Sequence, residues 1–420
     1  GRVQPPDGNH LEESGGDGGM KWEKVAIKDI CTGIYDGPHA TPPLSDTGAI
    51  FLGISNFNNG RLDFSDIRYI SEDDLPKWTK RVIPQKNDIV FSYEATLNLY
   101  AIIPEGFRGC LGRRMALLRV DETKADYKFL YYYFYSDAWR ATVNENIVLG
   151  ATVDRIPLIK FPDFPVELPP LETQHRIADI LSAYDDLIEN NQKQIKLLEE
   201  AAQRLYKEWF VDLRFPGHEN MEIVDGVPEG WSKSTVSEVS AVLRRGISPK
   251  YNEKARGIVI NQKCIRQTIV SYDEARTQEK KYPAELEMME SDIVICSTGA
   301  GTLGRVGQIF EAKGNATLDS HVTLIRANEK IGQQSLFWSL KMKQDYLMSA
   351  GKGSTNQLEL SRETIGSCEI LIPERKIAEQ VEKNFVAIHN KMKECSMQIA
   401  RLREVRDLLL PKLMSGEMKV

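Results

Sequence analysis

Apolar residues recur at heptad spacing in two long stretches without internal helix-breaking residues. Between Pro170 and Leu213 there is no Gly or Pro, and the first stripe comprises Leu181, Tyr184, Ile188, Ile195, Leu198, Ala202, Leu205 and Trp209. The second stripe, ending at Pro411, comprises Val381, Phe385, Ile388, Met392, Cys395, Ile399, Leu402, Val405 and Leu409. Each run of about 40 residues would extend roughly 60 Å as a helix. We predict two long helices that pair as an antiparallel coiled coil, with Asn191 and Asn384 as polar seam residues. The alternative is that each helix lies separately on its own domain.

The two stretches belong to an internal repeat with an offset of 200 residues. Identical residues at that offset are Leu171, Ile177, Ala178, Ile188, Asn190, Lys193 and Leu213. The segments upstream repeat more loosely, as in Asn87–Val90 and Ser291–Val294. A long repeat sets the architecture of a chain. It predicts two globular units, each followed by a long helix, with approximate two-fold symmetry.

Each globular unit has short strand-like runs followed by a helix, a Gly-containing loop and a final strand. The expected strands are 50–54, 88–91, 99–103, 115–120 and 159–164 in the first unit, and 257–261, 292–296, 305–310, 321–326 and 368–372 in the second. The expected helices are 127–141 and 334–350. Strands and helices do not alternate regularly, which predicts an α+β fold. The expected domains are a leading extension (1–19), a first globular domain (20–166), a central helix (167–217), a second globular domain (218–372) and a C-terminal helix (373–420).

Composition narrows the class of protein. The net charge of −6 argues against binding nucleic acid by bulk electrostatics, but near-neutral domains can still bind DNA through base contacts. No apolar run reaches the roughly 20 residues of a membrane span. Six scattered cysteines without a Cys-x-x-Cys pair predict a reducing cytoplasm and no zinc cluster. Residues 1–19, rich in Gly and acidic side chains, predict a disordered extension or an expression remnant.

The sequence offers no catalytic motif that survives inspection. Gly299, Gly301 and Gly304 match the dinucleotide fingerprint by spacing, but the following residues, 305–310, alternate like a strand instead of opening a helix. The glycines therefore predict a hairpin turn. A phosphate loop, an amino-methyltransferase loop and metal-ligand spacing of histidines are missing from the sequence. We predict a protein that is not an enzyme and that binds no metal.

Several strings resemble the DNA-specificity subunit of type I restriction–modification enzymes, and the resemblance covers about 400 of the 420 residues. The most specific string is Leu168-Pro-Pro-Leu-Glu-x-Gln-x-x-Ile-Ala178, at the start of the first long helix. The others are Asp36–Pro42, Gly246–Tyr251, Ser297–Arg305 and Gly353–Gln357.

The resemblance implies a DNA-recognition protein with two target recognition domains and no chemistry of its own. Each domain would read one half of an asymmetric bipartite site in the major groove, and the helices would fix the spacer. The implied partners are double-stranded DNA, two methyltransferase subunits that bring S-adenosylmethionine and methylate adenine at N6, and two motor–nuclease subunits that use ATP and Mg. A specificity subunit of a related DNA-modifying defence system and a coiled-coil scaffold that binds no DNA are the alternatives.

Residue chemistry selects candidates for DNA contact, because Arg and Lys favour guanine, Asn and Gln favour adenine, and Ser and Thr serve either. In the first domain they are His39, Thr41, Asn56, Asn58, Arg61, Tyr93, Arg113 and Arg114. In the second they are Arg245, Lys250, Tyr251, Asn261, Gln262, Lys263, Thr298, Arg305, Lys352 and Asn356. Changing Gln262 or Arg305 should alter one half-site only.

Apolar residues near the ends of the helices exceed what one coiled-coil seam needs. They are Trp209, Phe210, Leu213, Phe215, Leu408, Leu409, Leu410 and Leu413. We expect them to contact the methyltransferase subunits; packing against the chain's own domains is the alternative.

Overall fold

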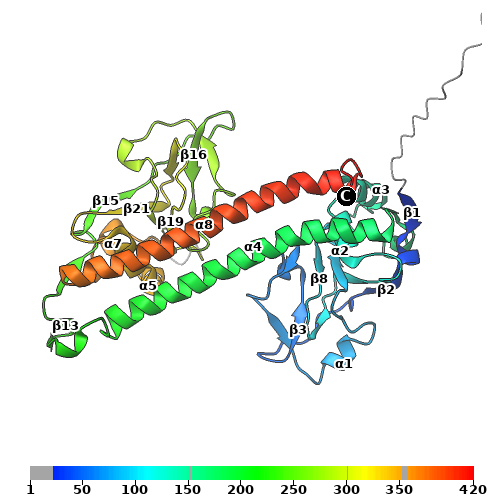
Figure 1. Ribbon diagram of the computed structural model, residues 1–420, viewed down its shortest axis with the longest axis horizontal. Helices are drawn as coiled ribbons and strands as arrows, with labels where there is room; N and C mark the ends of the chain where they lie inside the picture. Colours follow the sequence, from blue (N-terminus) through cyan, green and yellow to red (C-terminus); the bar gives the residue numbers. More distant parts are fainter. Residues whose placement is uncertain (1–21, 151–152, 300, 352–357) are drawn as a thin grey trace, which may run out of the picture. The chain divides into compact units, whose positions relative to one another are not determined.

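The computed structural model describes residues 22–150, 153–299, 301–351 and 358–420, which fold as two compact units. The first unit extends to Ile188 and includes Arg401–Val420, and the second is Glu189–Ala400. Each unit therefore consists of a globular part together with a segment of both long helices (Figure 1). Candidates Lys352 and Asn356 lie outside the described residues.

The first unit is built on a four-stranded antiparallel sheet with the order β2-β10-β7-β8. Its strands are β2 (Cys31–Asp36), β10 (Met115–Val120), β7 (Ile89–Ser92) and β8 (Tyr100–Ile102). A smaller sheet has the order β6-β3-β9, with β6 (Arg68–Ile70), β3 (Ala49–Leu52) and β9 (Gly109–Leu111), where β3 and β9 are parallel. Two further pairs are β1 (Glu23–Ala26) with β11 (Pro165–Leu168), and β4 (Phe57–Asn58) with β5 (Arg61–Leu62). The helices are α1 (Leu75–Trp78), α2 (Tyr127–Tyr133) and α3 (Asp137–Asn146).

The second unit repeats the four-stranded sheet, the three-stranded sheet and the β1–β11 pair of the first. Its four-stranded sheet has the order β15-β21-β18-β19, formed by β15 (Ser240–Arg245), β21 (Val322–Ala327), β18 (Ile293–Cys296) and β19 (Val306–Gln308). The three-stranded sheet is β17 (Arg276–Gln278), β16 (Gly257–Ile260) and β20 (Ala316–Leu318), again with one parallel pair. β14 (Ser232–Thr235) pairs with β22 (Glu369–Ile372), and β12 (Ile223–Val224) pairs with β13 (Val227–Pro228). The helices are α5 (Gln333–Met342), α6 (Gln344–Ser349) and α7 (Arg362–Gly366). The predicted duplication and α+β class are confirmed.

The long helices are α4 (Leu171–Tyr206), extended by a π-helical turn at Lys207–Val211, and α8 (Arg375–Met414). In the first unit, residues 177–181 of α4 share a core with residues 409–414 of α8, and Arg406 pairs with Asp185 at 2.6 Å. In the second unit, residues 202–206 share a core with residues 377–388. The helix segments are antiparallel in both units, as the heptad stripes predicted.

The start of α4 explains the most specific string of the sequence. Gln174 is buried, and its amide nitrogen donates to the Pro169 carbonyl at 2.8 Å. Its amide oxygen accepts the Asp126 N–H at 3.0 Å, at the N-cap of α2. This glutamine therefore fixes the beginning of the long helix to the helix of the globular part.

Five local predictions were wrong. The predicted helix 334–350 is α5 and α6, which are separated at Lys343. The predicted helix 127–141 is two helices, because the Ser136 side chain accepts the Trp139 N–H and caps a new one. The predicted strand 159–164 is replaced by β11, which begins at Pro165 and pairs with β1. Helix α8 continues through Pro411 to Met414, since only one backbone hydrogen bond is lost so close to its end. Asn191 is buried in the seam, but Asn384 is exposed because it lies one residue, about 100°, from Phe385.

Candidate nucleic-acid interface

The glycine-rich segment at residues 299–304 connects β18 and β19 as a hairpin, which confirms the predicted turn. Gly299, Gly301 and Gly304 all have positive φ. A Cβ on Gly304 would lie 2.4 Å from the Met348 backbone nitrogen, so only glycine allows α6 to pack this closely. Because a strand follows, these glycines do not form a dinucleotide site.

A basic pocket of about 510 Å³ opens beside this hairpin. Its cationic lining residues are Lys263, Arg266, Arg305 and Lys341, and none of the lining residues that the structure describes is acidic. Gln267, Thr302 and Gln344 add neutral hydrogen-bonding groups. This lining suits an anion.

Local structure places each cation of this basic pocket. The Asn261 side chain accepts the Lys263 N–H at 2.8 Å, which starts a 3-10 turn that buries Cys264 and leaves Lys263 exposed. Arg305 follows the glycine hairpin. Lys341, on α5, donates to the Val306 carbonyl at 2.9 Å and to Gln344 Oε1 at 3.1 Å. Burial lowers the pKa of Lys341, and the nearby Glu199 carboxylate on α4 opposes that shift.

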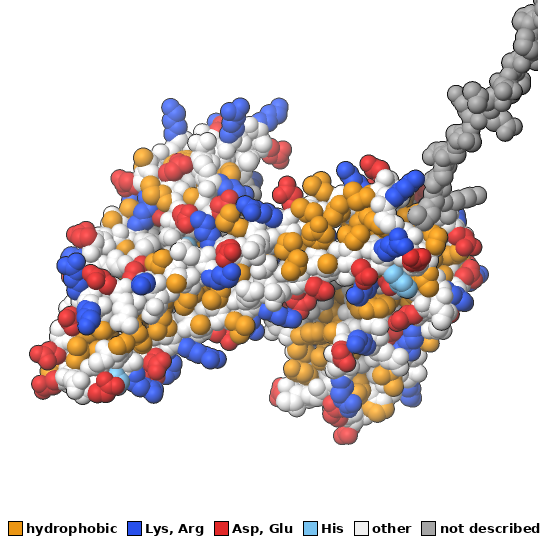
Figure 2. Space-filling model, in the orientation of Figure 1, with side chains coloured by type: hydrophobic (Ala, Val, Ile, Leu, Met, Phe, Trp, Pro, Cys, Tyr) orange, Lys and Arg blue, Asp and Glu red, His pale blue; other side chains and the backbone are white. Residues whose placement is uncertain are grey.

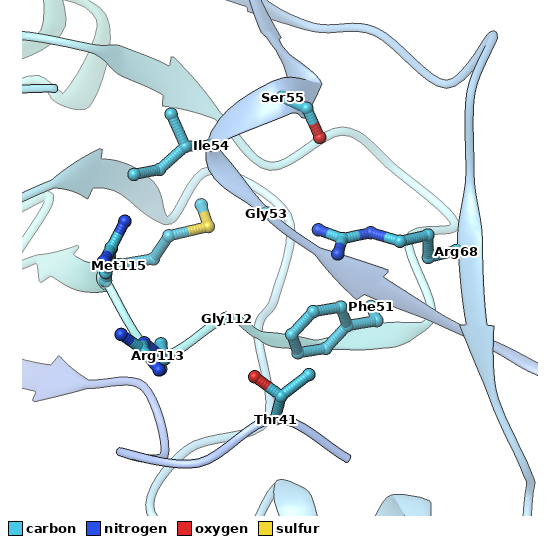
Figure 3. Close-up of a pocket in the computed structure, with 10 residues that line it drawn as sticks. Thr41, Phe51, Gly53, Ile54, Ser55, Arg68, Gly112, Arg113 and Met115 are labelled. Carbon is cyan, nitrogen blue, oxygen red and sulfur yellow. The ribbon is translucent and has the colours of Figure 1, made fainter. Parts of the chain in front are cut away.

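The first unit has a different pocket, of about 300 Å³, between β3 and the β9–β10 turn (Figure 3). Arg68 reaches into it from one side and Arg113 lies on the opposite side (Figure 3). The Arg68 guanidinium lies 5.0 Å from the centre of the Phe51 ring. Thr41 and Arg114 also line the pocket, with Arg114 Nε 3.4 Å from Glu94 Oε1. Sequence reasoning missed Arg68, Arg266 and Lys341, because only the fold brings them beside the predicted residues.

Two candidates of the first unit support the fold and cannot contact bases as the unit stands. Asn56 is 2% exposed; its oxygen accepts the Gly53 N–H at 2.9 Å, and its nitrogen donates to the Asp63 and Asp66 carbonyls. Tyr93 is buried and donates to the Arg113 carbonyl at 2.9 Å. Their burial could not be read from residue type, and a DNA contact of either side chain stays an untested prediction.

The remaining first-unit candidates have side chains at least partly exposed. Arg61 donates to the Asp185 carbonyl of α4 at 2.8 Å, and Asn58 donates to Asp63 at 3.0 Å. His39 Nε2 lies 3.0 Å from the Asp36 carboxylate. Arg113 and Thr41 are exposed, and no side-chain partner of Arg113 occurs among the described residues. These two are the most accessible candidates of this unit.

Several second-unit candidates are held by their own unit. Arg245 donates to the Leu360 carbonyl at 2.9 Å and pairs with Glu359. Both ends of the Asn261 amide are used, since its nitrogen donates to the Glu274 carbonyl. Thr298 is bonded to His321 at 2.6 Å, and the Gln262 amide oxygen is buried without a partner in the described part of the chain. Lys250 pairs with the exposed Glu279, and Tyr251 stacks on Arg276 at 3.5 Å.

Comparison with known proteins now adds to this geometry. The model of the type I restriction modification DNA specificity domain matches residues 20–200. The MjaIX specificity subunit of Methanocaldococcus jannaschii is 26% identical over 373 residues, covering 84% of this chain and 82% of the relative. The HindI specificity subunit of Haemophilus influenzae is 27% identical over 327 residues, covering 60% and 68%. The chain is thus similar to type I restriction enzyme specificity subunits, and the family model covers its residues 20–200.

A solved structure shares the fold of this chain. The type I restriction–modification S subunit from M. genitalium matches with a TM-score of 0.58 and 17% identity, over 94% of this chain and 96% of that one. In the described ranges of the chain, no three His, Cys, Asp or Glu side chains are grouped to hold a metal ion. No helix within those ranges is both long and apolar enough to span a membrane.

Most apolar residues expected at the methyltransferase interface pack inside the chain. Trp209, Phe210 and Phe215 are buried in the second unit's core, and Leu413 is buried in that of the first. Leu213, Leu409 and Leu410 pack partly against the same cores. For the buried four, this packing supports the alternative of contacts with the chain's own domains, and a partner contact stays an untested prediction. Leu408 is 61% exposed and remains a candidate for the methyltransferase interface.

Proposed function

We propose that this chain is a specificity subunit that reads a bipartite, asymmetric DNA site, one half per unit, and directs adenine N6 methylation and restriction by partner subunits. Two methyltransferase subunits would supply S-adenosylmethionine, and two motor–nuclease subunits would supply ATP-dependent restriction with Mg. The chain itself would perform no chemistry. Similarity to type I restriction enzyme specificity subunits supports this role.

The two units share one fold but differ in the side chains that line their pockets. This observation supports recognition of a bipartite site. Both units have the strand orders described above, yet their pockets differ: Arg68 and Arg113 line the first, and Lys263 and Arg305 line the second. A repeated scaffold with different polar side chains would read two different sequences. Arg113 and Thr41 are our proposed contacts in the first half-site, and Lys250, Tyr251, Lys263 and Arg305 in the second.

Methylome sequencing tests the proposal directly. Cells that express the chain with its cognate methyltransferase subunit are compared with cells that lack the chain. The proposal predicts a new bipartite motif with N6-methyladenine in each half. A stable complex that leaves no new mark would refute the methylation role.

Single substitutions then test the assignment of half-sites. Arg113→Ala should change bases only in one half of the motif, and Gln262→Ala only in the other. The spacer should remain unchanged in both variants. Loss of sequence preference in both halves from any one variant would contradict the modular reading.

A further inference from the structure

We propose that the basic pocket of the second unit, lined by Lys263, Arg266, Arg305 and Lys341, binds a backbone phosphate of the DNA beside the half-site read by that unit. The inference rests on the proposed function and adds two residues, Arg266 and Lys341, that residue chemistry alone did not select. The proposal assigns these cations to positioning of the DNA backbone and leaves reading of the bases to other residues.

The positive charge of the basic pocket is compensated only in part. Four of its described lining residues are cationic and none is acidic. Two carboxylates outside the lining act on these cations: Glu199 on Lys341, and Glu274, whose Oε1 lies 3.9 Å from Arg266 Nη2. Lys263 and Arg305 have no ion-pair partner in the described ranges. Like charges gathered in this way repel one another, and an anion bound among them relieves the repulsion.

The lining also favours a phosphate over a base edge. Base edges are read by side chains that project into the major groove, whereas these cations line a concave pocket. Lys341 is anchored through its bonds to the Val306 carbonyl and Gln344, so its ammonium is fixed at the wall. Arg266 is steadied by its Nε–H donated to the Lys263 carbonyl at 3.2 Å. Fixed donors around a concave site lose little conformational entropy when they bind an oxyanion.

The two exposed cations provide the test. The double variant Lys263→Gln/Arg266→Gln keeps side-chain length and removes two charges without touching the half-buried Lys341. Binding of the full-length chain to a fluorescein-labelled mixed-sequence duplex is measured by anisotropy over a salt series. Binding should weaken about tenfold or more, and the slope of log K against log salt should shrink by about one. Lys376→Gln, an exposed lysine of α8 outside the pocket, is the matched control and should change neither quantity.

A second measurement locates the phosphate. In a duplex carrying the methylated motif, single phosphates are replaced by neutral methylphosphonates. One position near the second half-site should weaken binding of the wild type and have little further effect on the double variant. Additive losses at every position would overturn the proposal.

Other outcomes separate the inference from the proposed function. Unchanged affinity and salt slope in the double variant, with wild-type binding to the motif intact, would overturn the phosphate site and leave the specificity role standing. Loss confined to the motif duplex, with mixed-sequence binding unaffected, would overturn it in favour of base reading. Stabilisation by inorganic phosphate that is lost in the double variant, with DNA binding unaltered, would reassign the pocket to a free anion. Wild-type protein that binds no duplex, alone or with its methyltransferase, would instead refute the proposed function.

Discussion

Arg326 and Asp292 form a two-point ion pair at the edge of the second unit's core, with Nε–Oδ1 2.6 Å and Nη2–Oδ2 2.8 Å. The first unit repeats this pair as Arg119 and Asp88, at 2.9 and 2.8 Å. Each aspartate is 2% exposed and directly precedes the central strand β18 or β7. The repeat thus includes a charge pair that connects two neighbouring strands in both units.

Asp292→Ala should destabilise the second unit by about 3 kcal/mol, since the arginine would keep a partly buried charge without its partner. The substitution also removes the acceptor of the Met289 N–H, 2.7 Å away. Urea unfolding followed by the fluorescence of tryptophan measures the change. Asp163→Ala, which removes an exposed pair with Lys28, is the matched control and should change stability by less than about 1 kcal/mol. Equal effects of the two substitutions would contradict the importance assigned to burial.

His389 should make folding sensitive to mild acid. Its ring is 4% exposed and contacts Gln308 and Ser291, with Glu290 and Lys393 beside it. Burial lowers the pKa of His389 from 6.5 to about 4. Between these two values the unfolded chain binds a proton that the folded chain does not, so the histidine's contribution to stability, full above pH 6.5, is lost as the pH falls toward 4.

The measurement is the free energy of unfolding at pH 7.5 and pH 5 for the wild type and His389→Gln. Titration of the histidine should account for a loss of about 2 kcal/mol between these conditions in the wild type. Glutamine retains hydrogen-bonding groups but does not titrate, so its loss should be smaller by that amount. The same loss in both proteins would mean that other groups determine the acid sensitivity.

The sequence predicted the long helices and the duplicated fold better than the short strands and the accessible residues. Heptad spacing located both helices because most of the stripe that pairs them is buried or half-buried, with Leu181 and Phe385 fully buried and Val405 the exposed exception. Strands β9 and β20, which pair in parallel with β3 and β16, were not predicted. Each is three residues long and depends on a partner more than 50 residues away in the sequence.

The candidate site could be predicted only in part, because it too depends on contacts between residues that are far apart in the sequence. Lys263 and Arg305 were selected by chemistry, but the approach of α5, which adds Lys341, is a tertiary event without a local signal. Asn56 shows the reverse situation. Its side chain was selected by chemistry, but its amide forms hydrogen bonds within the turn that it stabilises.

Leu408 should mark a partner contact on α8. Apolar side chains gather over parts of both long helices on the face shown in Figure 2, and Leu408 is 61% exposed while the nearby Leu413 is fully buried. Leu408→Ser should leave the unfolding free energy within about 0.5 kcal/mol of the wild type and weaken binding of the methyltransferase subunit in a titration by calorimetry. Leu413→Ser should destabilise the first unit, because it puts a hydroxyl and a cavity into the core. An unaltered affinity of Leu408→Ser for the methyltransferase subunit would contradict the prediction that Leu408 lies at this interface.

The final prediction concerns the helices as a spacer. Deleting four residues from α4 between Asp185 and Gln194 removes about one turn, or roughly 6 Å. If the helices set the separation of the two half-sites, the DNA spacer in the methylated motif should shorten by one or two base pairs while the bases of both halves stay the same. Deleting residues 2–5 of the leading segment is the control and should leave the motif unaltered. Methylome sequencing reads both effects, and an unchanged spacer in a variant that still methylates DNA would refute the role of the helices as a ruler.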